Sequence, residues 1–67
     1  MNLKLNGKAI EIKEENVSLY DFLVSRQFEP ERLVVELNFE IVPKEKWKDV
    51  ILKENDTIEV LRFVGGG

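Results

Sequence analysis

The chain begins with alternating apolar and polar residues, a pattern that predicts a β-hairpin. The alternation runs on both sides of Asn6-Gly7, a pair that two-residue hairpin turns prefer because both turn positions take positive φ. A two-residue turn places Leu3 opposite Ile10 and Met1 opposite Ile12. These apolar side chains then share one face of the hairpin, and we expect a helix to pack against that face.

A short helix is predicted to begin after Ser18. Serine is a favoured N-cap residue, and Asp21 follows at the third helical position, where an acidic side chain suits a helix N-terminus. Pro30 disfavours helical conformation in the residue before it, so we expect the helix to end near Gln27. The apolar stripe that would face the sheet consists of Leu19, Phe22, Leu23 and the aliphatic stem of Arg26.

Two strands are predicted in the middle of the chain. Leu33 to Leu37 is almost continuously apolar at its start, which is typical of an inner strand near the sheet centre that is covered on much of both faces. Asn38-Phe39 is predicted to form a turn into a short strand from Glu40 to Val42. Pro43 has no backbone N–H to donate, so we expect this short strand to lie at an edge or to end in a turn.

A single helical turn is predicted from Lys44 to Lys48, and it carries Trp47. Because tryptophan is highly buried on average, we expect Trp47 to close one end of the core. Lys53 to Asp56 is predicted to form a tight turn, in which Asn55 adopts the left-handed conformation that such a return requires.

The last strand is predicted from Thr57 to Val64, and its apolar pattern changes face before it ends. Ile58 and Val60 alternate on one face, whereas Leu61 and Phe63 fall on the other. Because a domain of this size has one core, we expect Leu61 and Phe63 to be partly exposed. Exposed apolar side chains beside a functional terminus suggest a docking patch. The alternative is that they cover the rim of the core.

The predicted elements follow one another as hairpin, helix, strand, short strand and final strand. If the last strand lies centrally and parallel to the first, one helix can cover a mixed sheet of four to five strands, which is the β-grasp topology. The sequence therefore predicts an α+β protein with one domain over residues 1–64 and a flexible tail over residues 65–67.

The composition removes most routes to independent catalysis. The 67 residues contain no cysteine and no histidine, which excludes thiolate nucleophiles, imidazole acid–base pairs, disulfides and zinc fingers. We therefore expect a protein that is not an enzyme and binds no metal or cofactor itself. The charges are interspersed and sum to −3, whereas nucleic-acid binding requires a basic stripe. No segment approaches the ~20 apolar residues of a membrane helix, and a chain without cysteine fits a reducing cytoplasm.

Gly65-Gly66-Gly67 ends the chain and is the strongest indication of function. Glycine loses more backbone entropy on ordering than any other residue and has no side chain to bury, so a folded core gains nothing from this tail. A tip without side chains can enter a narrow active site of another protein and present its terminal carboxylate, which makes Gly67 the candidate reactive residue. The alternative interpretation is a frayed terminus or a linker scar.

Several segments together resemble the ThiS family, the ubiquitin-like β-grasp sulfur carriers of thiamine thiazole synthesis. The resemblance covers nearly the whole chain, and Val42-Pro43 followed by Trp47, together with the free glycine end, carries most of it. The chain departs from the usual family pattern at Asn55, where glycine is common, and at Lys44, where arginine is common. The matching segments are Asn6-Gly7, Ser18-Leu19, Val34 to Asn38, Ile41 to Pro43 with Trp47, Asp56 to Glu59 and Val64 to Gly67.

The resemblance implies a chemistry for the terminal carboxylate. In the family, an E1-like adenylyltransferase of the ThiF type uses ATP to form an acyl-adenylate on the last glycine, here Gly67. A sulfur donor, such as a cysteine desulfurase or a sulfurtransferase, then displaces AMP and leaves a thiocarboxylate, which delivers sulfur to a ThiG-type thiazole synthase. Gly65 and Gly66 would form the neck that enters the partner's active site, and Leu61 and Phe63 would dock on the partner. The nucleotide and any zinc would belong to the activating enzyme.

Three other functions stay open at this point. The carrier subunit of molybdopterin synthase also ends in Gly-Gly on a β-grasp domain, although its chains tend to be longer, and Val42-Pro43 with Trp47 favours the thiazole carrier. A ubiquitin-like modifier would attach Gly67 to lysines of target proteins. A plain interaction module would make no use of the tail.

Overall fold

The computed structural model describes residues 1–63, which form a five-stranded sheet with one α-helix. Val64 and the predicted tail, Gly65 to Gly67, lie outside the described residues, as does the predicted domain boundary after residue 64. No helix in residues 1–63 is long and apolar enough to cross a membrane. In chain order the elements are β1 (Asn2–Leu5), β2 (Lys8–Glu11), α1 (Leu19–Ser25), η1 (Pro30–Arg32), β3 (Leu33–Leu37), β4 (Glu40–Ile41), η2 (Lys44–Lys46) and β5 (Thr57–Arg62), where η marks a 3₁₀ turn.

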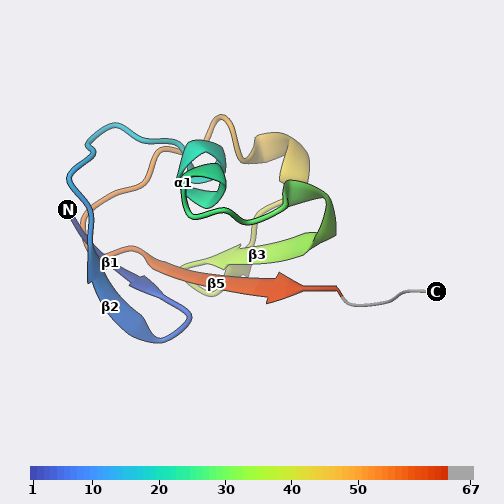
Figure 1. The fold of residues 1–67 in the computed structure, drawn as a ribbon, viewed down its shortest axis with the longest axis horizontal. Helices are drawn as coiled ribbons and strands as arrows, with labels where there is room; N and C mark the ends of the chain where they lie inside the picture. The colour runs from blue at the N-terminus through green and yellow to red at the C-terminus, as the bar shows by residue number, and fades with distance from the viewer. Residues whose placement is uncertain (64–67) are drawn as a thin grey trace.

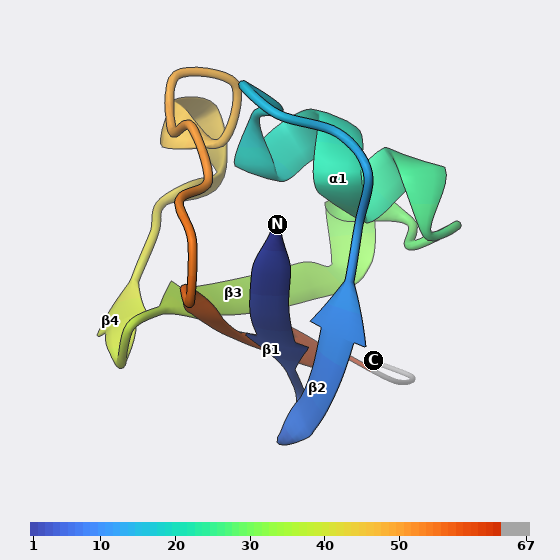
Figure 2. The same cartoon turned by 90° about the vertical axis from the view of Figure 1, so that its left-hand side faces the viewer.

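The strands are arranged in the order β2-β1-β5-β3-β4. The last strand, β5, therefore lies at the centre, parallel to β1 and antiparallel to β3. α1 crosses one face of this sheet (Figures 1 and 2). This arrangement confirms the predicted β-grasp topology and its α+β class.

The opening hairpin has the predicted register. Leu3 pairs with Ile10 across β1 and β2, and Met1 exchanges backbone hydrogen bonds with Ile12 at 2.8 and 2.9 Å. The turn has φ of +50° at Asn6 and +82° at Gly7, as a turn with two left-handed residues requires.

The core lies between α1 and the sheet. The Ser18 hydroxyl accepts a hydrogen bond from the Asp21 N–H at 3.0 Å, so the predicted N-cap is confirmed. Trp47 is 1% exposed and its indole Nε1 donates to the Val42 carbonyl at 2.8 Å, which confirms that it closes the core. The remaining fully or nearly buried apolar residues are Leu3, Leu19, Phe22, Leu23, Leu33, Val35, Leu52, Ile58 and Val60.

The structure differs from the sequence predictions mainly at β3. This strand is an inner strand next to the central β5, so its predicted place near the sheet centre is confirmed. Leu33 and Val35 are buried, whereas Val34 on the other face is half-buried. The predicted cover on both faces is therefore complete on the α1 side and only partial on the opposite side. The reason is that α1 covers one side of the sheet, so alternate residues of an apolar run face away from it.

Asparagine side chains fasten β5 at both of its neighbours. The Asn6 side-chain oxygen accepts from the Val60 N–H at 2.7 Å, and the Asn38 side-chain oxygen accepts from the Thr57 N–H at 2.9 Å. Asn38 also donates to the buried Asp56 carboxylate at 2.9 Å. These bonds join the two hairpin turns to the strand that leads to the C-terminus.

We predict that Asn38→Ala lowers the free energy of unfolding by about 2 kcal/mol, because it removes two hydrogen bonds and leaves the Asp56 carboxylate with one partner fewer. Urea unfolding followed by Trp47 fluorescence measures the change. Asn16→Ala is the matched control: Asn16 is also exposed and also has a positive φ, +58°, but its side chain makes none of the Asn38 hydrogen bonds to Thr57 and Asp56. Equal losses in the two variants would show that backbone conformation, and not the Asn38 network, explains the effect.

Candidate functional site

The face of the sheet opposite α1 is open along β3, β4 and β5 in the described part of the chain (Figure 2). Because side chains alternate along a strand, the residues between the buried ones project to this open face. We call this surface the open face. It comprises Val34 and Glu36 on β3, Ile41 on β4, and Glu59 and Leu61 on β5.

The open face is apolar near the end of β5. Leu61 lies directly opposite Val34 and is 57% exposed, while Phe63, one residue beyond β5, is 64% exposed. The prediction that Leu61 and Phe63 are partly exposed is therefore confirmed. Whether they dock on a partner stays a prediction.

The chain is held firmly at the last described residue. The Phe63 N–H donates to the Arg32 carbonyl at 2.8 Å, which extends the β3–β5 pairing one residue past β5. The glycines Gly65, Gly66 and Gly67 follow outside the described residues. The exposed pair thus consists of Leu61 on β5 and Phe63 directly after it, and in the sequence both shortly precede the predicted reactive tail.

A second apolar area borders the turn between β3 and β4. Ile41 is 66% exposed and Phe39 is 78% exposed. The turn residues Asn38 and Phe39 have φ of +50° and +72°, a conformation that is uncommon for a bulky side chain. Phe39 therefore gains little burial in return for an unfavourable backbone conformation in the free protein.

Sequence reasoning identified Leu61 and Phe63 but missed the other members of the open face. Val34 was assigned to a strand covered on both sides, and Ile41 was read only as part of a short strand. The period-two pattern of β3 and β4 held part of this information, since Val34 and Glu36 alternate with buried residues. Their alignment with Leu61, however, required the pairing register.

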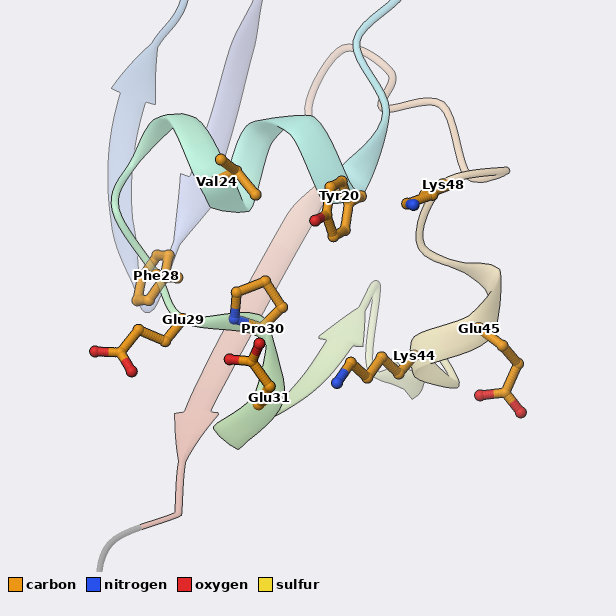
Figure 3. A pocket seen from close by; sticks show the side chains of 9 residues that line it. All are labelled: Tyr20, Val24, Phe28, Glu29, Pro30, Glu31, Lys44, Glu45 and Lys48. Atoms are coloured by element: carbon orange, nitrogen blue, oxygen red, sulfur yellow. The ribbon is translucent and has the colours of Figure 1, made fainter.

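A groove lies on the helix side of the molecule, away from the open face. Its volume is about 790 Å³, and Lys48 extends toward Tyr20, with its ammonium 4.9 Å from the ring centroid (Figure 3). None of the residues predicted to act in function lines it. The lining residues are Tyr20, Val24, Phe28, Glu29, Pro30, Glu31, Lys44, Glu45 and Lys48.

Among residues 1–63, the carboxyl group of Glu54 has a pKa that departs clearly from its usual value. Hydrogen bonds from the side chain and backbone of Asn2 lower the pKa of Glu54 below its usual value. These contacts fasten β1 to the loop before β5, because Asn55 also donates its N–H to the Asn2 carbonyl at 2.7 Å. The lowered pKa of Glu54 is thus explained by a structural contact with β1, and Glu54 is not part of the open face.

Comparison with known proteins gives a consistent family assignment. The ThiS family model matches residues 3–67. The sulfur carrier protein ThiS of Bacillus subtilis is 43% identical over 65 residues, which cover 97% of this chain and 98% of that protein. The crystal structure of the thiamine biosynthesis protein ThiS from Geobacter metallireducens superposes with a TM-score of 0.86 at 32% identity, covering 100% of both chains.

A longer protein contains a related segment. A thiazole synthase of Magnetococcus marinus is 37% identical over 67 residues, which span 100% of this chain and only 20% of that protein. Together, the match of the family model over nearly all residues, the high identity to a full-length relative and the shared fold show that this chain belongs to the ThiS family.

Proposed function

We propose that this chain is a sulfur carrier in thiamine biosynthesis and that Gly67 is the residue that carries the sulfur. The main support is that the family model matches through the last glycine, and that a relative of nearly equal length is named a sulfur carrier. The carrier acts as a protein substrate of its partner enzymes and works in the cytoplasm.

The chemistry explains why a partner and ATP are needed. A carboxylate is a poor electrophile because its negative charge repels nucleophiles and oxide is a very poor leaving group. Attack of the Gly67 carboxylate on the α-phosphorus of ATP releases pyrophosphate and gives an acyl-adenylate. A sulfur donor at the sulfide level then attacks the acyl carbon, AMP leaves, and the product is a thiocarboxylate.

The carrier's own contribution is recognition and presentation. In this proposal an E1-like adenylyltransferase binds the nucleotide, and the tail residues Gly65 and Gly66 pass through its narrow active-site channel. Leu61 and Phe63 dock beside that channel, because they are exposed at the end of β5 and directly after it, shortly before the tail in the sequence. The rigid sheet then fixes the starting point of the tail.

A thiazole synthase is the proposed acceptor of the sulfur. The support is the Magnetococcus marinus thiazole synthase, in which one polypeptide contains a stretch similar to this whole chain. Joining a carrier to its acceptor raises their effective concentration, which is useful only when the two act on one another. The sulfur comes from the persulfide of a cysteine desulfurase or a sulfurtransferase, and a thiol reductant must cleave the S–S bond of that persulfide to release the sulfur at the sulfide level, with a disulfide as the oxidised product.

We predict that incubation with ATP, an E1-like adenylyltransferase of the ThiF type and a sulfide source converts the chain to its thiocarboxylate. Intact mass spectrometry detects the replacement of one oxygen by one sulfur, and fragmentation places it on Gly67. The enzyme's own carrier, converted in parallel, shows that the enzyme is competent. A competent enzyme that also adenylates this chain but leaves no sulfur on it would contradict the carrier function.

We predict that Gly67→Ala reduces adenylation at least tenfold while leaving the thermal midpoint unchanged, because the added methyl crowds the partner's channel and not this protein's core. Gly7→Ala is the reverse control, since φ is +82° at Gly7 and the space around its Cβ is open. It should lower stability by about 1 kcal/mol and leave adenylation intact. A destabilised Gly67→Ala variant would mean that the tail packs on the domain.

We predict that Leu61→Glu and Phe63→Glu each weaken binding to the adenylyltransferase about tenfold, because a carboxylate replaces an apolar contact. The free energy of unfolding should change by no more than about 0.5 kcal/mol, since both positions are exposed. Isothermal titration calorimetry and urea unfolding measure the two effects. Val24→Glu, on the outer side of α1 at 46% exposure, is the matched control, and equal weakening by this variant would disprove a specific role for the open face.

A further inference from the structure

The open face holds two carboxylates directly opposite each other. Glu36 on β3 and Glu59 on β5 are paired residues in the antiparallel register, and both are half-buried. Cβ atoms of directly paired residues are only about 4.5–5.5 Å apart, so two like charges at such positions repel each other. In the free carrier this pair therefore destabilises the folded state.

The neighbouring positions do not compensate for the pair at Glu36. On its other side, β4 places the apolar Ile41 directly opposite Glu36. The cation on the same face is Lys4 of β1, which is paired with Thr57 and is therefore diagonal to Glu59. Glu36 lies on the far side of β5 from Lys4. The repulsion between the two carboxylates is therefore compensated least at Glu36.

The carboxylate pair borders apolar residues of the open face on two adjacent sides. Val34 and Leu61 are one row nearer the C-terminal end of β5, about 7 Å away along the strands. Ile41 continues the row of Glu36 across the sheet to the edge strand β4 and is 66% exposed. A partner that covers this face therefore meets two adjacent negative charges together with apolar surface beside them.

We propose that the Glu36–Glu59 pair accepts an arginine side chain of the thiazole synthase, with apolar residues of the same enzyme covering Val34, Leu61 and Ile41. A guanidinium has several N–H donors in a planar fork and can bond two carboxylates at once. Its positive charge removes the repulsion within the pair, and the apolar surroundings strengthen the interaction by excluding water. The inference rests on the proposed carrier function, because it names the chemistry of the acceptor's docking surface.

This assignment separates stability from binding, which gives it a direct test. Glu36→Gln keeps the size of the side chain and removes one charge, so it should raise the thermal midpoint of the free carrier by roughly 1–5 °C. The same change should weaken binding to a purified ThiG-type thiazole synthase about tenfold or more, because the guanidinium loses a carboxylate. Glu36→Arg should also be stable, since it pairs with Glu59, and should bind at least as weakly.

Glu40→Gln is the matched control. Glu40 is exposed and opposite Leu37 on β3, so strand alternation points it away from the open face while the net charge changes equally. Differential scanning calorimetry and surface plasmon resonance at two salt concentrations measure the effects. The result expected is weaker binding for both Glu36 variants, with a smaller salt dependence, and unchanged binding for Glu40→Gln.

Three results would overturn the inference. The first is that Glu36→Gln binds the synthase as tightly as the wild-type chain does. The second is that this variant has a lower thermal midpoint. The third is that it weakens binding to the adenylyltransferase alone, which would identify that enzyme as the partner that covers the pair. Thiocarboxylate formation on the wild-type chain is measured separately with an excess of adenylyltransferase. If the wild-type chain is converted but Glu36→Gln binds the synthase normally, the docking inference alone is wrong, whereas a failure of conversion contradicts the carrier function.

Discussion

The rest of the structure depends on the pairing of β5 with both of its neighbours. β5 is the last strand in the sequence and the central one in the sheet, so it joins the opening hairpin to the β3–β4 pair. Without this strand no backbone hydrogen bonds would join the β1–β2 hairpin to the β3–β4 pair. Its buried residues Ile58 and Val60 also contribute to the core beneath α1. The stability of the sheet and the connection between its two halves therefore depend on the same six residues.

Asparagine side chains make this pairing specific. Asn6 and Asn38 each occupy a left-handed turn position and each accept a backbone N–H of β5. Asparagine suits both tasks, because it tolerates positive φ and carries a side-chain amide. The turns at opposite ends of the sheet thus hold β5 in register. A strand that slipped by one residue would exchange its buried and exposed faces.

The fold of residues 1–63 leaves one face of the sheet uncovered. The core occupies one side of the sheet, which leaves alternate residues of β3, β4 and β5 free for recognition. Some of these residues are unfavourable in the free protein, namely the exposed Phe39 at positive φ and the facing carboxylates of Glu36 and Glu59. Functional surfaces commonly retain features of this kind at a cost in stability. The groove beside α1 is separate from this surface and contains charges of both signs.

The sequence by itself determined the local elements. Asn6-Gly7, the Ser18 cap and the left-handed Asn55 were predictable because turn and cap geometry depends on a few neighbouring residues. The exposure of Leu61 and Phe63 followed from the change of apolar face in one strand. The alternation along β3 separates Val34 from the buried residues, but tertiary structure decided which face of the strand α1 covers and that Glu36 opposes Glu59. Both depend on which strands pair, on their register and on which face α1 covers. These are contacts between residues far apart in the sequence, so a local pattern of apolar and polar residues does not specify them.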